Sequence, residues 1–95
     1  MRYIHKILHM PQISYFLGIV IRMFYRDHNP PHFHAVYGNF EAIIDIERNE
    51  LISGYLPPRV LGLVTEWAAL NQKELMENWE RARRQESLKA IAPLV

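Results

Sequence analysis

The sequence predicts an α+β domain, in which a mostly antiparallel sheet of four or five strands is followed by two helices packed on one face. Two observations indicate this class. Residues before Pro57-Pro58 form β-branched and aromatic runs separated by turn residues, whereas those after it are rich in Leu, Ala, Glu, Lys and Arg, which favour helix. Strands first and helices afterwards are typical of an α+β fold. With 95 residues, the chain has room for a single domain.

Several segments of the first half have the composition and spacing of strands. The run 19–25 is nearly continuous in apolar residues, which favours a central position in the sheet. Segments 32–37 and 40–47 are joined by Gly38-Asn39, a two-residue link that is typical of a hairpin. Two shorter candidates lie at 13–16 and 51–55.

The second half predicts two helices. Pro58 suits the first turn of a helix, where no backbone N–H is needed for the helical hydrogen bonds. Apolar residues then recur at helical spacing, at Val60, Leu63, Val64, Trp67 and Leu70. Asn71 followed by Glu74 has the spacing of a capping box, which predicts a second helix from Gln72 to about Gln85. One long bent helix is an alternative, because no Gly or Pro separates the two halves.

Composition excludes several classes of protein. The chain has no cysteine, which excludes disulfide scaffolds, Cys-type zinc fingers and iron–sulfur clusters. Its 11 basic and 10 acidic residues give a net charge of +1, so only a local patch could bind nucleic acid. The most apolar run, 13–25, is interrupted by Arg22 and is too short to span a bilayer. We therefore expect a cytoplasmic protein with no membrane partner.

The hairpin fixes a register for the polar residues. With Gly38-Asn39 as the loop, Phe33 faces Ile44 on the buried side of the two strands. On the other side His34 faces Ile43 and His32 faces Asp45. We expect Asp45 to orient the His32 ring and to favour its charged form.

These residues define a candidate site on a partly open sheet face. We assign His32, His34 and Asp45 as candidate catalytic residues, with Arg22 and Arg26 as anion-binding residues. Asp27 and His28 lie in the stiff, proline-rich loop that leads to the histidines and belong to the surroundings of the site. The competing interpretation is the ordinary solvated face of an alternating strand.

A metal site is the other alternative for the same stretch. His28, His32 and His34 could supply three neutral nitrogens to zinc or a similar ion. However, His28 would have to fold back across Pro30-Pro31, and the spacing matches no zinc signature. We therefore expect no tightly bound structural metal and no cofactor.

The string DHNPPHFHAVYG and several further motifs carry a resemblance to a known family. Together with ELMENWE and IAPL in the second half, it makes the chain similar, from about Met10 to Leu94, to the bacterial domain of unknown function 4160 family. The resemblance implies a small intracellular bacterial or phage-borne protein, encoded beside another small protein as in a toxin–antitoxin pair. It brings no assigned catalytic residues. Relatives usually start at the position of Met10, so residues 1–9, which lack strand alternation, are expected to be a peripheral lead-in to a domain spanning 10–95.

The leading hypothesis is therefore a toxin–antitoxin-like component that acts on RNA or binds its partner protein through this His/Asp/Arg face. The expected partner is the small protein encoded by a neighbouring gene. The first alternative is a non-catalytic module that binds a metal or another ligand. A purely structural partner domain is the second alternative.

Overall fold

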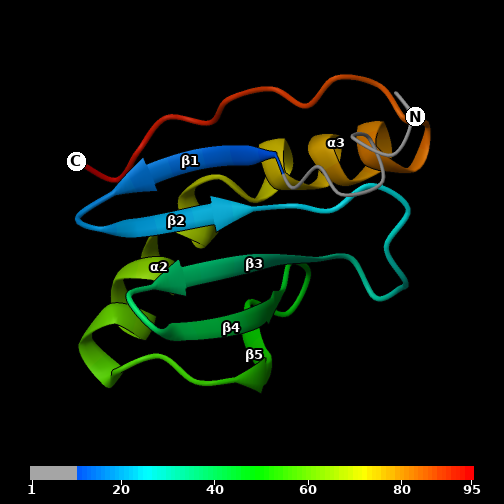
Figure 1. The fold of residues 1–95 in the computed structure, drawn as a ribbon. Helices are drawn as coiled ribbons and strands as arrows, with labels where there is room; N and C mark the ends of the chain where they lie inside the picture. The colour runs from blue at the N-terminus through cyan, green and yellow to red at the C-terminus, as the bar shows by residue number, and fades with distance from the viewer. Residues whose placement is uncertain (1–10) are drawn as a thin grey trace.

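The computed structural model describes residues 11–95 and consists of a five-stranded antiparallel sheet followed by two helices (Figure 1). The strands lie side by side in the order of the sequence. They are β1 (Gln12–Phe16), β2 (Ile19–Arg22), β3 (His32–Tyr37), β4 (Phe40–Asp45) and β5 (Glu50–Gly54). The predicted α+β class is confirmed. The lead-in expected over residues 1–9 lies outside the described residues.

Two strands end earlier than the sequence predicts. β2 stops at Arg22 instead of continuing to residue 25, and the chain turns at Arg26, whose φ is 59°. β4 stops at Asp45 because its carboxylate accepts a hydrogen bond from the Arg48 backbone N–H at 2.9 Å, which closes a turn. Short polar side chains compete with the sheet ladder for backbone hydrogen bonds in this way. The apolar composition of a segment does not show where this happens.

The register predicted from the Gly38-Asn39 loop is confirmed. In the ladder between β3 and β4, Phe33 pairs with Ile44, His34 with Ile43 and His32 with Asp45. On the other side of β3, the ladder with β2 pairs His34 with Arg22. Backbone pairing thus places the two histidines and Arg22 on one side of the sheet, because alternate strand residues point to the same face.

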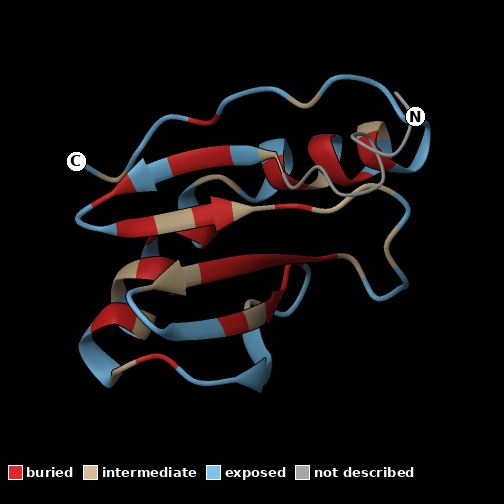
Figure 2. Ribbon diagram, in the orientation of Figure 1, coloured by how far each residue is buried: buried red, intermediate tan, exposed pale blue. Residues whose placement is uncertain are grey.

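The two predicted helices are α2 (Pro58–Leu70) and α3 (Gln72–Arg83), and both lie behind the sheet in Figure 1. Their apolar faces join the inward side chains of the strands in one core, which appears in Figure 2 as the buried segments. Trp67 is fully buried in it, as expected from its spacing, and Trp79 of α3 is fully buried as well. In residues 11–95 neither helix is long and apolar enough to cross a bilayer.

Asn71 separates the two helices but does not form the predicted capping box. Its side chain makes no cap hydrogen bond to α3. Instead Asn71 Nδ2 donates to the Trp67 carbonyl at 2.8 Å, in the last turn of α2. Carbonyls at a helix end lack helical partners, so the amide satisfies the preceding helix rather than the following one.

The C-terminal segment after α3 is irregular and runs along the outside of β1 (Figure 1). Its path is fixed by hydrogen bonds to buried side chains. The Asn78 amide both donates to the Lys89 carbonyl and accepts from the Lys89 N–H, each at 2.8 Å. Trp67 Nε1 donates to the Ala92 carbonyl at 2.8 Å, and the Ile91 backbone N–H donates to the Ile13 carbonyl of β1 at the same distance.

Candidate functional site

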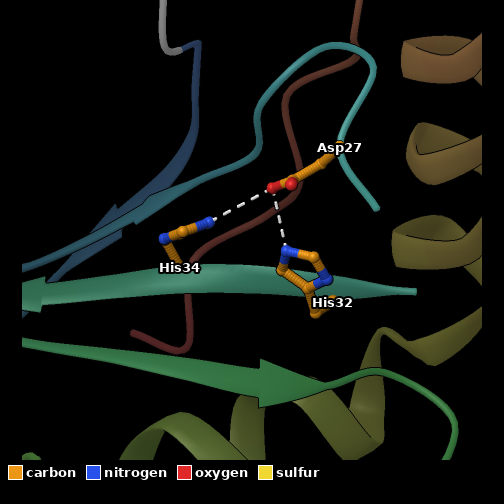
Figure 3. A group of neighbouring side chains, drawn as sticks. All are labelled: Asp27, His32 and His34. Carbon is orange, nitrogen blue, oxygen red and sulfur yellow. Dashed lines mark hydrogen bonds and ion pairs between the residues drawn. The ribbon is translucent and has the colours of Figure 1, made fainter. Parts of the chain in front are cut away.

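Three side chains converge where β3 begins, and Figure 3 shows them pointing toward one another. The Nε2 atom of His32 lies 2.9 Å from Oδ2 of Asp27, and the Nε2 atom of His34 lies 3.5 Å from the same oxygen. The histidines come from β3, and Asp27 comes from the loop between β2 and β3. We call these three residues the His–Asp cluster.

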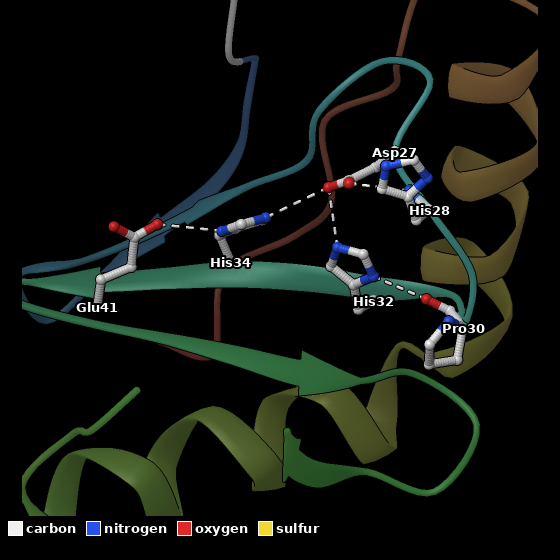
Figure 4. Close-up of polar contacts among 6 residues, drawn as sticks. All are labelled: Asp27, His28, Pro30, His32, His34 and Glu41. Carbon is white, nitrogen blue, oxygen red and sulfur yellow. Dashed lines mark hydrogen bonds and ion pairs between the residues drawn. The ribbon is translucent and has the colours of Figure 1, made fainter. Parts of the chain in front are cut away.

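The far nitrogen of each imidazole has its own acceptor (Figure 4). His32 Nδ1 lies 2.7 Å from the Pro30 carbonyl oxygen, and His34 Nδ1 lies 3.0 Å from Oε2 of Glu41. A carbonyl and a carboxylate only accept hydrogen bonds, so both Nδ1 atoms carry the proton. This assignment leaves the two Nε2 atoms directed at Asp27.

The cluster is more buried than the partly open face predicted from the sequence. The His32 and His34 side chains are 9% and 10% exposed. The Trp79 ring of α3 lies 5.1 Å from His32, centroid to centroid, and Phe24 packs edge-on against His34 at 4.4 Å. The expected exposure is wrong because α3 and the loop after β2 cover this end of the face. Strand pairing could not reveal this cover, because neither Trp79 nor Phe24 belongs to the ladder.

The cluster needs a positive charge at its centre. If each imidazole were neutral with its proton on Nδ1, the Nε2 lone pairs would face the Asp27 carboxylate. The contact of His34 Nε2 at 3.5 Å is too long for a good hydrogen bond, and this buried nitrogen has no hydrogen-bond partner within residues 11–95. A proton or another cation between these atoms removes the repulsion.

The Asp27 carboxylate is held in its ionised form. Burial raises the pKa of this carboxyl, but a hydrogen bond from the His28 backbone and interactions with His32 and His34 outweigh burial. Its pKa therefore lies below the ordinary value. The His28 N–H donates to Oδ1 at 2.9 Å and leaves Oδ2 free to face the two imidazoles.

Asp45 does not take the position expected of it. It lies opposite His32 in the ladder, but its carboxylate accepts from the Arg48 N–H and makes no hydrogen bond or ion pair with His32. Asp27, which we expected in the surroundings, is the carboxylate that meets both rings. Turn closure within the Asp45 loop is local, so it outcompetes a cross-strand contact.

The other expected residues are arranged unequally around the cluster. Arg22 is half-buried beside His34 in the ladder. Arg26 is exposed, and its guanidinium lies 2.8 and 3.0 Å from the side-chain oxygen of Gln85 in the orientation of that amide that satisfies both groups. The His28 ring is exposed, and only its backbone contacts Asp27.

Glu41 is a residue of the site to which the sequence gives no role, although the predicted register places it on the polar face with the histidines. It sits opposite Val36, on the same face as His34, and its carboxylate reaches the His34 ring diagonally. The predicted register already placed it on this side of the hairpin. Diagonal neighbours on one face lie within reach of long side chains, which was the available signal.

Comparison with known proteins gives a family but no described relative. No curated protein and no solved structure matches the chain. The family model for the domain of unknown function DUF4160 matches residues 18–80, which include β2 to β5, all of α2 and most of α3. The matched segment contains every residue of the His–Asp cluster. Because this match covers more than half of the chain, the protein belongs to the DUF4160 family.

Proposed function

We propose that the protein is the RNA-cleaving component of a bacterial, cytoplasmic toxin–antitoxin-like pair, with the His–Asp cluster as its reactive centre. One observation carries the proposal: two buried imidazoles direct their Nε2 atoms at a single carboxylate oxygen. The gene pairing implied by the family resemblance supplies the biological setting. The partner is the small protein encoded by the neighbouring gene, which binds this protein and relieves its effect.

Burial of this cluster supports a function beyond folding. Taking polar groups out of water costs free energy unless every group is paired, and the His34 Nε2 atom has no hydrogen-bond partner within residues 11–95. The fold already has a continuous apolar core from β1 to the C-terminal segment. Apolar side chains at positions 32 and 34 would stabilise the sheet more simply, so stability does not account for the cluster.

The chemistry of RNA cleavage matches the groups present. A 2′-hydroxyl that attacks the adjacent phosphorus must lose its proton, and the leaving 5′-oxygen must gain one. The centre of the cluster, between the two Nε2 atoms and Asp27, is the place where such a proton can be held. Arg22, next to His34, supplies a positive charge for the phosphate.

Controlled expression of the gene tests the proposal. We expect growth arrest on induction, relief by co-expression of the neighbouring gene, and cleavage of RNA by the purified protein. His34→Ala removes one ring of the cluster and should abolish arrest, because acid–base groups contribute about 10²–10⁴-fold to rate.

The matched control is His28→Ala, which removes an exposed ring from the same loop and keeps the backbone N–H that contacts Asp27. It should arrest growth like the parent. Circular dichroism confirms that both variants are folded. If the folded parent chain neither arrests growth nor cleaves RNA, the RNA-cleaving function is excluded. Binding of the neighbouring protein alone would then favour the partner-binding role.

A further inference from the structure

We propose that Asp27, His32 and His34 bind one divalent transition-metal ion of the Zn²⁺ or Fe²⁺ type through Oδ2 and the two Nε2 atoms. The inference names what occupies the centre of the His–Asp cluster. Only the role of the ion in RNA cleavage rests on the function proposed above. Its geometric basis holds for any substrate.

The two distances from Asp27 Oδ2 to the imidazole nitrogens match those between ligands of one metal ion. All three lie within 4.8 Å of one another, and Asp27 Oδ2 is 2.9 and 3.5 Å from the two nitrogens. An ion with ligands at about 2.0–2.2 Å holds neighbouring ligand atoms about 2.8–3.6 Å apart in tetrahedral or octahedral geometry. Both distances from Oδ2 fall in this range without any movement of the backbone.

Both imidazoles are oriented as metal ligands usually are. A ligating histidine donates its second ring N–H to a carbonyl or carboxylate, which fixes the ring and strengthens the ligating nitrogen. His32 makes this contact with the Pro30 carbonyl, and His34 makes it with Glu41. Each Nε2 lone pair is thereby presented to the centre of the cluster.

The polar atom left without a partner also points to a ligand. His34 Nε2 is buried and has no hydrogen-bond partner within residues 11–95, although an ionised carboxylate faces it. A metal ion at the centre would bind this lone pair, the lone pair of His32 and the carboxylate together. The contacts among these three groups, which are unfavourable or incomplete without a cation, would be replaced by three bonds to the metal ion.

The ligand set selects the class of metal. Two neutral imidazoles and one carboxylate suit Zn²⁺, Fe²⁺ and their neighbours, whereas Mg²⁺ and Ca²⁺ prefer oxygen ligands. Three protein ligands leave at least one position for water or substrate, as in catalytic rather than structural sites. A water bound there would lose a proton to solvent more readily than free water, and the hydroxide left on the ion would accept the proton of an attacking hydroxyl.

The site differs from the metal alternative that the sequence suggested. That alternative required His28, whose ring is exposed and lies outside the cluster, and it omitted Asp27. The ion proposed here is not needed for folding, because the apolar core is continuous without it. The expectation that no structural metal is bound is therefore compatible with this site.

Metal titration of the full chain tests the inference. Protein purified without a histidine tag and treated with chelator is titrated with Zn²⁺, Co²⁺ and Mg²⁺ by calorimetry. We expect one Zn²⁺ or Co²⁺ per chain and no comparable binding of Mg²⁺. Visible absorption of bound Co²⁺ and quenching of Trp79, which lies 5.1 Å from the His32 ring, give readouts independent of activity.

Variants identify the ligands. His34→Ala and Asp27→Asn should each weaken Co²⁺ binding by more than 100-fold, because loss of a ligand costs more than loss of its supporting partner. His28→Ala should bind within a few-fold of the parent. Equal losses in His28→Ala and His34→Ala, with all variants folded, would overturn this ligand set.

The inference and the RNA-cleaving function fail separately. Absence of Zn²⁺ and Co²⁺ binding by the folded, metal-free parent overturns the metal site, even if that protein still cleaves RNA. Stoichiometric binding by a chain that neither arrests growth nor cleaves RNA supports the metal site and overturns the RNA-cleaving function.

Discussion

The Oδ2 atom of Asp27 lies 2.9 Å from Nε2 of His32, although no strand pairing brings these two residues together. The loop after β2 folds back over the start of β3 and delivers the carboxylate there. The same oxygen faces His34, so one loop residue links both imidazoles of the sheet. The composition of the His–Asp cluster therefore depends on Asp27 as much as on the histidines.

Asp27 and Asp45 are expected to behave oppositely when substituted. Asp27→Asn should lower activity by about 100-fold or more, because the amide cannot balance the charge at the centre of the cluster. Asp45→Ala should leave activity within a few-fold and lower the free energy of unfolding by about 1 kcal/mol, because it removes the hydrogen bond from the Arg48 N–H. Growth arrest and urea unfolding measure the two effects. An inactive but stable Asp45→Ala would restore Asp45 to the site.

Glu41→Ala should weaken metal binding by about 10–100-fold without affecting the fold. The carboxylate accepts the hydrogen bond of His34 Nδ1 and fixes the ring, and such supporting contacts have this effect on affinity. Its side chain is 55% exposed, so stability should change by no more than about 0.5 kcal/mol. The control is Glu47→Ala, an exposed acidic residue outside the cluster. Identical Co²⁺ affinities for the two variants would contradict the supporting role.

The metal-free protein should lose an Asp27-dependent part of its stability in acid. The pKa of this carboxyl is lower in the folded state than the ordinary value, so the ionised form favours folding. The contribution is present above the unfolded pKa, about 3.9, and is lost as the pH falls through the lower folded pKa.

The measurement compares urea unfolding of the parent and Asp27→Asn between pH 5 and pH 2.5, in chelator. The difference in free energy should shrink over this range, because protonation of Asp27 removes the charge that distinguishes the two chains. Other carboxyls titrate equally in both chains and cancel. A difference that stays constant with pH would show that the Asp27 contacts do not favour the ionised form.

Asn78→Ala should destabilise the protein by about 2–4 kcal/mol. Asn78 is 1% exposed and makes two hydrogen bonds to the backbone of Lys89, so truncation removes both hydrogen bonds together with the buried amide that makes them. Lys89→Ala is the matched control, because only the backbone of Lys89 takes part. It should lie within about 0.5 kcal/mol of the parent in thermal or urea unfolding. Similar stability of the two variants would mean that the C-terminal segment contributes little.

Three glycine-to-alanine substitutions should rank in a fixed order. A Cβ at Gly54 would lie 2.2 Å from the Glu41 carbonyl oxygen, at a φ of +84°, so Gly54→Ala should be the most destabilising. Gly38→Ala meets no atom within 4 Å but has a φ of +58°, which costs about 1–2 kcal/mol. Gly62→Ala, in an open position of α2, should stabilise by about 0.5–1 kcal/mol. Urea midpoints in any other order would contradict these backbone assignments.

Much of the fold follows from local sequence. Gly38-Asn39 sets the register of β3 and β4, because a two-residue loop leaves only one way to pair the flanking strands. Pro58 marks the start of α2, and the apolar spacing after it places Trp67 in the core. These features depend on neighbours along the chain or across one turn, so composition and period are sufficient to predict them.

The chemical identity of the site was decided only by tertiary structure. The sequence singled out His32 and His34 and placed them on one face, but it paired His32 with Asp45 instead of Asp27. Which carboxylate reaches the rings depends on the path of the loop after β2, and strand register contains no information about that path. Burial of the rings likewise depends on Trp79 of α3, more than forty residues further along the chain. Long-range packing of this kind is set by the balance of many contacts, and no local pattern records it.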